Sequence, residues 1–336
     1  MDYRKLSLTG PEVSRIALGT MTFGAETDED SARLILDEFM TAGGRLIDTA
    51  DVYSDGISEE WIGRWLRADP SRRERVVLAT KGRFAVSGQP DAGLSKKYLH
   101  TALDASLRRL GVDHVDLYQA HGPDNRTALS ELLEFFDEAV ASGKTTHVGV
   151  SNFTGWQLAT LATQAGSDTG PAIVAHQPQY SLLAREVEWE VMPAAIHHDV
   201  GAIVWGPLAA GWLTGKYRRD QPPPAGTRLG EDPDRGLEAW SRRANPHTWA
   251  VLETLRSVAE EADVTPAQAA LAWVAERPGV RAAIVGARTA EQLRSSLVAA
   301  EVRLTETQTA RLDAVSAPGT PDYPYQFIGQ LAERTD

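Results

Sequence analysis

Short apolar runs alternate with longer amphipathic stretches along most of this chain, and the alternation restricts the folds open to it. Eight runs rich in β-branched and other apolar residues predict strands, at residues 16–21, 45–50, 76–81, 115–121, 146–150, 173–177, 202–205 and 282–285. Helical spacing of apolar residues follows at residues 30–42, 58–66, 96–110, 127–141, 155–164 and 188–197. Strands that alternate with helices form a parallel sheet with right-handed crossovers, so an α/β fold is expected.

The stretch at 96–110 shows the helical pattern clearly. Leu99, Leu103, Leu107 and Leu110 recur at steps of four, four and three residues, which places them on one face of a helix. Ser95 is a favourable N-cap, and Gly111 is a favourable stop. This helix is expected to bury a single apolar stripe.

Eight strand–helix units can close into a (β/α)8 TIM barrel, and an open doubly wound sheet is the competing arrangement. No predicted strand is followed by the G-x-G-x-x-G turn of a dinucleotide-binding open sheet, which favours the barrel. Residues 3–6 and 13–15 flank Thr9-Gly10-Pro11 and predict an N-terminal β-hairpin that covers the amino-terminal end of the barrel. With no linker evident, residues 1–336 are interpreted as one domain.

Residues 218–245 interrupt the alternation of predicted strands and helices, and they predict a long loop after the seventh strand. The segment is rich in proline and glycine: Pro222, Pro223, Pro224, Gly226, Gly230, Pro233 and Gly236. Loops of this length in compact domains are lids, binding loops or disordered segments. A lid or binding role is expected, with disorder as the alternative.

Composition argues against several classes of partner. The 34 Lys and Arg residues against 46 Asp and Glu give a formal net charge of −12, which disfavours binding to nucleic acid and to anionic membrane surfaces. Cys is absent, which removes disulfides and thiolate chemistry. The first residues lack the apolar core of a signal peptide, and no apolar run approaches the ~20 residues of a membrane span. The chain is therefore expected to be cytoplasmic.

Ionisable side chains lie where three consecutive predicted strands end. Asp48 ends the second strand and Tyr53 follows it, Lys81 ends the third, and His121 ends the fourth. In a parallel barrel these ends lie on one rim, where active sites are built. Since burying such groups unpaired costs several kcal/mol, they are expected to pair with one another.

Several motifs, in order along nearly the whole chain, resemble the aldo-keto reductase superfamily. They read LGTMTFG at residues 18–24, IDTADVY at 47–53, VGVSNF at 148–153 and PLAAGWLTGKY at 207–217. The resemblance implies a barrel enzyme that reduces carbonyl compounds with NADPH. It also implies a catalytic tetrad of Asp48, Tyr53, Lys81 and His121, which uses no metal.

In the implied mechanism Tyr53 is the general acid. A phenol has a reference pKa of about 10, so the resemblance assigns Lys81 the role of lowering it and Asp48 that of holding the ammonium. His121 orients the carbonyl. Hydride passes from C4 of the nicotinamide to the carbonyl carbon as Tyr53 protonates the oxygen.

The resemblance also implies the cofactor contacts. Ser151, Asn152 and Gln177 are expected at the nicotinamide carboxamide, Trp205 stacked on its ring, Leu208, Gly211 and Lys216 at the pyrophosphate, and Gly286, Arg288 and Gln292 at the adenosine end; Gly19, Thr20, Met21, Asp48, Gly206 and Pro207 complete the set. The Arg288 guanidinium suits a 2′-phosphate and predicts NADPH. Ser295 and Ser296 depart from the acid or amide followed by Asn that is common in relatives, which leaves room for NADH.

The expected partner is a small-molecule carbonyl substrate, sugar-like compounds included, with Phe23, Trp212 and the 218–245 loop as candidate apolar walls. Ordinary packing is the alternative role for these residues. An NADPH-binding regulatory or sensor subunit with little turnover is the alternative function, because some similar barrels serve as channel subunits. A metal-dependent hydrolase built on His121, His176, His197 and His198 is disfavoured, since adjacent histidines on a helix splay apart. The sequence leaves the oligomeric state open.

Overall fold

A closed barrel of parallel strands forms the centre of the molecule. The computed structural model describes residues 1–336 except 88–91, 168–169, 235 and 333–336. Eight strands make the barrel in this described part: β3 (Ile16–Gly19), β4 (Leu46–Asp48), β5 (Val77–Gly82), β6 (Val115–Ala120), β7 (Thr145–Ser151), β8 (Ile173–Gln177), β9 (Gly201–Val204) and β10 (Val280–Gly286). They follow chain order from β3 to β10, and β10 pairs with both β9 and β3. The (β/α)8 expectation is confirmed.

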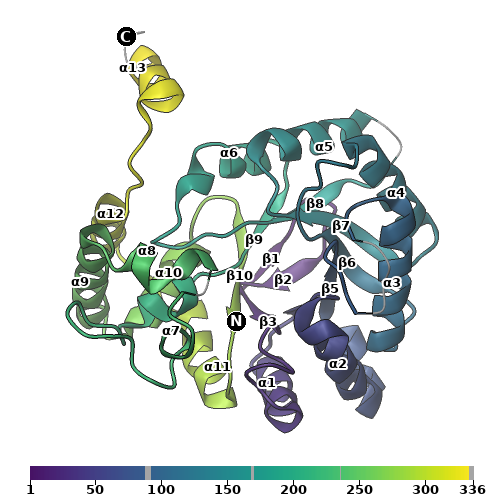
Figure 1. Cartoon of the computed structure of the whole chain (residues 1–336), viewed down its shortest axis with the longest axis horizontal. Helices are drawn as coiled ribbons and strands as arrows, with labels where there is room; N and C mark the ends of the chain where they lie inside the picture. Colours follow the sequence, from purple (N-terminus) through teal and green to yellow (C-terminus); the bar gives the residue numbers. More distant parts are fainter. Residues whose placement is uncertain (88–91, 168–169, 235, 333–336) are drawn as a thin grey trace.

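Helices surround the barrel (Figure 1). Those following the predicted strands are α1 (Glu29–Thr41), α2 (Ile57–Ala68), α3 (Lys96–Leu110), α4 (Leu129–Ala141), α5 (Gly155–Ser167), α6 (Val191–His197) and α11 (Ala290–Leu297). In α3 the Ser95 side chain accepts from Tyr98 N, and Gly111 ends the helix with a φ of 66°, as its sequence predicts. The stretch predicted at 188–197 is shorter, because a 3-10 turn at Glu186–Glu188 precedes α6.

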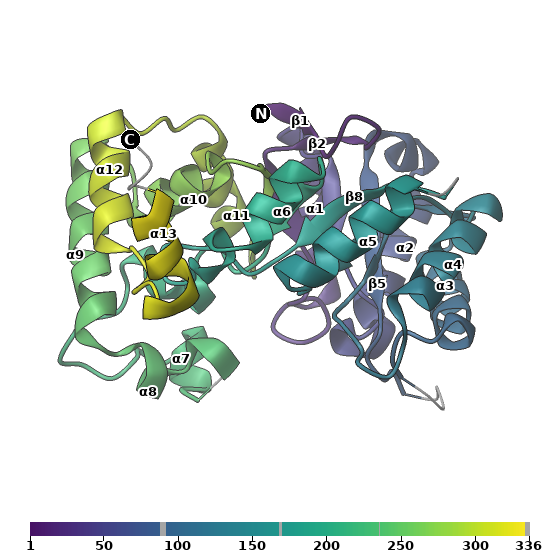
Figure 2. The ribbon, with the colours of Figure 1, turned by 90° about the horizontal axis from the view of Figure 1, so that it is seen from above.

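Among the described residues, the longer helices without a counterpart in the sequence predictions lie toward the C-terminus. These are α9 (Pro246–Glu261), α10 (Pro266–Ala275) and α12 (Glu306–Val315). Figure 2 shows α9 and α12 side by side at the flank of the barrel. A short α13 (Phe327–Ala332) projects away from the body in Figure 1. No helix within the described residues is both long and apolar enough to cross a membrane.

An N-terminal hairpin covers one end of the barrel, as predicted. Its strands are β1 (Tyr3–Lys5) and β2 (Glu12–Ser14). Leu6 and Val13 are fully buried and join the apolar cluster that fills the barrel. Leu8 N donates to Asp199 Oδ2 at 2.7 Å, which fixes the hairpin tip. Because the hairpin covers this end, a small-molecule site is expected at the opposite end, at the carboxyl ends of the strands, where barrel active sites lie.

The long segment after β9 is built on buried aromatic packing. Trp212 is fully buried, stacks on Trp240 at 4.7 Å between ring centroids, and donates from Nε1 to Glu238 O. The described residues of this segment form short helical turns, α7 (Arg228–Glu231) and α8 (Trp240–Arg243) among them. Phe23 is also fully buried. Both Phe23 and Trp212 are core residues, so their prediction as walls of a substrate site is wrong.

Candidate active site

Asp48 and Lys81 form a buried ion pair at the carboxyl ends of neighbouring strands. Asp48 ends β4, Lys81 lies near the end of β5, and the two side chains are 3% and 0% exposed. Lys81 Nζ donates to Asp48 Oδ2 at 2.8 Å, to Thr49 O at 2.8 Å and to Tyr53 Oη at 3.1 Å. Burial opposes its charge, but Asp48 and then Tyr53 raise the pKa of Lys81 overall. The lysine is therefore an ammonium ion at neutral pH.

Tyr53 reaches this ion pair because the chain turns sharply after it. Ser54, Asp55 and Gly56 all adopt the left-handed backbone region, with φ of 47°, 57° and 94°. An ammonium group has three donors and no acceptor, so the Tyr53 oxygen accepts from Lys81 and its own proton is left for another acceptor. Burial raises the pKa of Tyr53, and the opposing effect of Lys81 is smaller. Lys81 thus acts in the expected direction but is outweighed, and the phenol retains its proton.

His121 stands over the tyrosine as a neutral imidazole. Its ring is edge-on to Tyr53 at 5.9 Å and to Phe84 at 4.9 Å between centroids. Burial, with smaller effects of Lys81 and Arg83, lowers the pKa of His121 to about 2. Within the described residues its buried Nδ1 has no hydrogen-bond partner. The four side chains predicted to converge therefore do so.

Amide groups hold the other oxygen of Asp48. Gln177 Nε2 donates to Asp48 Oδ1 at 2.8 Å, and Gln119 Nε2 lies 3.4 Å from the same atom. Both glutamines are buried at strand ends, on β8 and β6. Gln119 was not predicted, although it directly precedes the Ala120-His121 pair. These contacts fix the carboxylate that holds Lys81.

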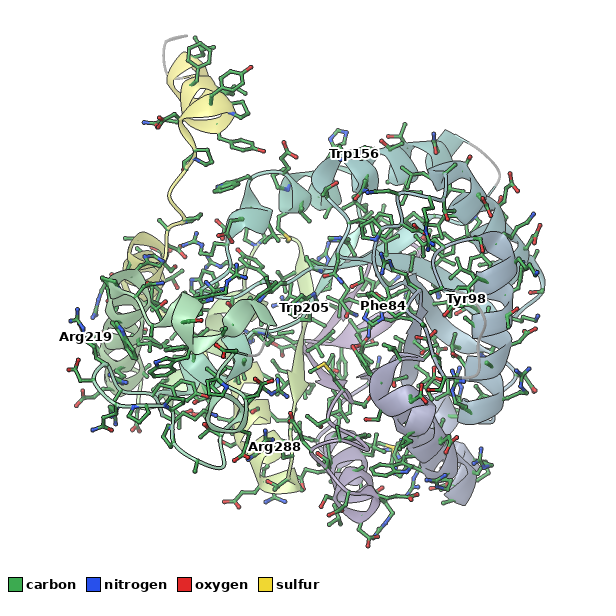
Figure 3. All side chains as sticks on the ribbon, viewed as in Figure 1. Phe84, Tyr98, Trp156, Trp205, Arg219 and Arg288 are labelled. Atoms are coloured by element: carbon green, nitrogen blue, oxygen red, sulfur yellow. The ribbon has the colours of Figure 1, made fainter. Side chains whose placement is uncertain are left out.

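A second set of polar contacts connects β7 to Trp205. Asn152, with a left-handed φ of 61°, donates from Nδ2 to His121 O and to Ser151 Oγ. Trp205 Nε1 donates to Asn152 Oδ1 at 2.9 Å, and Ser151 Oγ donates to Gln177 O at 2.9 Å. Figure 3 shows the Trp205 and Phe84 side chains near the middle of the barrel. The residues predicted around a nicotinamide are thus in mutual contact.

Cationic side chains lie further along the same rim. Arg288 Nε is 3.1 Å and Arg228 Nη2 is 3.2 Å from Glu26 Oε2. Partial desolvation, and then the charges of Arg288 and Arg228, lower the pKa of Lys216. Arg228 was not predicted, because a single arginine within a proline-rich segment carries no spacing signal. Figure 3 shows Arg288 near α1 and α11.

The remaining predicted cofactor residues line the strand ends between these two groups. Thr20 is buried and donates to Asp48 O at 3.1 Å, while Met21 is 45% exposed. Gln292 Oε1 accepts from Arg288 N at 3.0 Å in the first turn of α11, as its predicted position implies. Gly19 and Gly286 are the last residues of β3 and β10. Gly206, Pro207, Leu208 and Gly211 lie in the turns after β9, with positive φ at Gly206 and Gly211.

Asp51 is a buried carboxyl group behind the ion pair that sequence reasoning did not single out. It is fully buried, and neither carboxylate oxygen makes a well-formed hydrogen bond among the described residues. Burial, and then the nearby Glu59 carboxylate, raises the pKa of Asp51 to about 8, against smaller effects of Arg109 and Lys81. Glu59 itself is held by Arg109 Nε at 2.6 Å and Thr80 Oγ1 at 2.5 Å. Asp51 is therefore largely protonated at neutral pH.

Asp51→Asn is expected to stabilise the protein increasingly as pH rises. Between about pH 4, where an unfolded aspartate ionises, and about pH 8, the folded chain keeps a proton that the unfolded chain has lost, so stability falls as pH rises. The asparagine side chain does not ionise, so the variant avoids this loss of stability. Its free energy of unfolding is expected to exceed that of wild type by on the order of a few kcal/mol at pH 9 and by much less at pH 5. Urea unfolding at both pH values checks this, with Asp113→Asn at an exposed position as control. A destabilised Asp51→Asn at pH 9 would contradict it.

The histidine metal site, which the sequence disfavoured, has no counterpart in the described part of the chain. There, no three His, Cys, Asp or Glu side chains lie close enough to hold an ion. His197 and His198 contact each other at the end of α6, whereas His176 is buried on β8.

Comparison with known proteins agrees with the fold. The model of the Aldo/keto reductase family matches residues 15–317. An uncharacterized oxidoreductase of Bacillus subtilis, YrpG, is 39% identical over 96% of this chain and 99% of its own length. A probable voltage-gated potassium channel subunit beta of Arabidopsis thaliana is 33% identical over 90% and 92%. A versiconal hemiacetal acetate reductase of Aspergillus parasiticus is 29% identical over 95% and 98%.

The chain therefore belongs to the aldo/keto reductase family, a family of oxidoreductases with a barrel fold.

Proposed function

We propose that this protein is a cytoplasmic, NADPH-dependent reductase of aldehydes or ketones with Tyr53 as its general acid. The observation that carries the proposal is the buried contact of Lys81 Nζ with both Asp48 Oδ2 and Tyr53 Oη. It leaves a protonated phenol beside a fixed positive charge at the end of the barrel where substrates bind. A family relative whose name states reduction of a hemiacetal acetate supports the same direction of chemistry.

The side chains at the strand ends fit a dinucleotide. Trp205 is half-buried at the end of β9 and offers an indole face to a nicotinamide ring, while Ser151, Asn152 and Gln177 supply polar groups for its carboxamide. A Cβ on Gly211 would lie 2.7 Å from Lys216 Nζ, so the glycine leaves that amine accessible to a phosphate. Arg228 and Arg288 add two guanidinium groups, which suit phosphate oxygens.

Bound at these residues, NADPH would supply the hydride that reaches the carbonyl carbon. Tyr53 donates its proton to the carbonyl oxygen as negative charge develops there, and the resulting phenolate is stabilised by the Lys81 ammonium 3.1 Å away. Asp48 keeps the ammonium in place. The neutral His121 imidazole carries one N–H, which donates a hydrogen bond that orients the carbonyl.

Direct binding tests the cofactor assignment. Wild-type protein is expected to bind NADPH about tenfold or more tightly than NADH, because the 2′-phosphate meets Arg288. Replacement of Arg288 by Ala is expected to remove most of that preference while leaving NADH binding nearly unchanged. Isothermal titration of both nucleotides decides it, and equal affinities in the wild-type chain would contradict the assignment.

A regulatory role is the second candidate function, because several relatives are named as potassium channel subunits. The same cofactor site serves either role, so binding alone does not separate them. Turnover does: steady consumption of NADPH with a panel of aldehydes, ketones and sugar-like carbonyl compounds supports the reductase. Binding of NADPH without consumption across the panel would favour the regulatory subunit.

A further inference from the structure

Glu26 places a carboxylate among the cations proposed to bind phosphate. Its Oε2 lies 3.1 Å from Arg288 Nε and 3.2 Å from Arg228 Nη2, and its side chain is 19% exposed. Nearby, Lys216 adds a third positive charge. The Glu26 carboxylate therefore contacts the same two guanidinium groups that a bound phosphate would contact.

The backbone holds Glu26 at this position. Glu26 N donates to Thr22 O at 3.0 Å, and Gly24 N donates to Thr27 O at 3.1 Å, which closes a compact turn between β3 and α1. Thr22 Oγ1 then donates to Ala287 O at 3.1 Å, which connects this turn to the residue before Arg288. The approach of Glu26 to Arg288 is therefore built into two adjacent loops rather than being a chance contact of long side chains.

The two arginines are also held independently of Glu26. Arg288 Nη1 donates to Gly226 O at 3.4 Å, and Arg228 lies in α7, whose first turn is capped by Thr227 and whose Leu229 is fully buried. Removing the carboxylate is thus expected to leave both guanidinium groups near their present positions. The effect of Glu26 on a ligand can then be separated from an effect on loop order.

We propose that Glu26 is a specificity-determining residue that limits the preference of this site for an adenosine 2′-phosphate. Its carboxylate competes with the phosphate for Arg228 and Arg288 and repels it, whereas a ribose 2′-hydroxyl carries no charge to repel. NADH binding is therefore nearly insensitive to Glu26, and NADPH binding is weakened by it. This inference rests on the proposed use of a nicotinamide dinucleotide.

Glu26→Gln tests the inference without any turnover. The amide has nearly the same shape but no charge, so affinity for 2′,5′-ADP is expected to rise about tenfold at low ionic strength, and affinity for 5′-AMP to change less than about twofold. Isothermal titration of these two nucleotides gives both numbers. Thermal unfolding of the nucleotide-free variant reports whether loss of the contacts disturbs the fold.

Glu38→Gln is the matched control. Glu38 pairs with Arg294 at 2.6 Å between α1 and α11, so the variant removes the same charge and breaks a similar pair away from Arg288. It is expected to change neither affinity. Unchanged or equally weakened binding of both nucleotides by Glu26→Gln would overturn the inference while leaving the proposed function intact. If the wild-type protein binds neither NADPH nor NADH, both the inference about Glu26 and the proposed function are overturned.

Discussion

Tyr53→Phe is expected to lower kcat for carbonyl reduction by about 10²- to 10⁴-fold, the usual contribution of a general acid. The substitution removes only the hydroxyl that lies 3.1 Å from Lys81 Nζ. Lys81 uses its other two donors on Asp48 and Thr49, so the ammonium does not itself replace the missing hydroxyl as proton donor. Steady-state assays with NADPH and the best aldehyde substrate give the ratio.

The loss should lie in kcat rather than in cofactor affinity. The Kd for NADPH is expected to change less than about threefold, because the phenol acts in the transition state. Tyr118→Phe is the matched control: its hydroxyl is buried without a partner in the described structure, so kcat should remain within about twofold. Undiminished turnover in Tyr53→Phe would remove the phenol from the mechanism.

Lys81→Met is expected both to abolish measurable turnover and to lower the free energy of unfolding by about 3 kcal/mol. The variant leaves the Asp48 carboxylate buried without its cation, although Gln177 still donates to Asp48 Oδ1 at 2.8 Å. The phenolate formed by Tyr53 would also lose the charge that stabilises it. Urea unfolding and turnover assays measure the two effects separately.

A double variant separates the structural from the chemical role of this pair. Lys81→Met with Asp48→Asn removes both charges, so it should regain much of the lost stability while remaining inactive. Recovery of turnover together with stability would mean that Lys81 acts only through folding. Equal stability of Lys81→Met and wild type would contradict the buried ion pair itself.

The ends of the strands, and the convergence of four side chains there, were predictable because local sequence patterns determine them. The apolar runs identify the strands, and parallel strands bring the carboxyl ends of β4, β5 and β6 to one rim, which is how Asp48, Lys81 and His121 meet. The motif around Tyr53 supplied the fourth group. These side chains meet where the barrel topology puts them.

The helices that were missed show where local patterns fail. α10 is buried on nearly every side, so its apolar residues show no helical stripe, although the Thr265 and Gln268 capping box marks its start. The 218–245 segment takes its form from packing of Trp212 on Trp240, which joins residues distant in the chain. Neither feature follows from spacing.

Electrostatic detail was the least accessible to sequence. Lys81 was expected to lower the pKa of Tyr53, but the extent of burial, which only the fold determines, reverses the net direction. Glu26 and Arg228 lie in separate loops and meet at 3.2 Å through tertiary structure alone. The raised pKa of Asp51 depends likewise on burial, and then on Glu59 from α2.

Transfer of an isotope label tests the central claim most directly. Purified protein is given NADPH deuterated at both C4 positions together with an aldehyde that it consumes, and the alcohol is examined by mass spectrometry. One deuterium on the carbinol carbon is predicted, with label transfer falling in Tyr53→Phe as turnover does. Alcohol formed without deuterium, or no oxidation of NADPH with any carbonyl compound of the panel, would contradict the account.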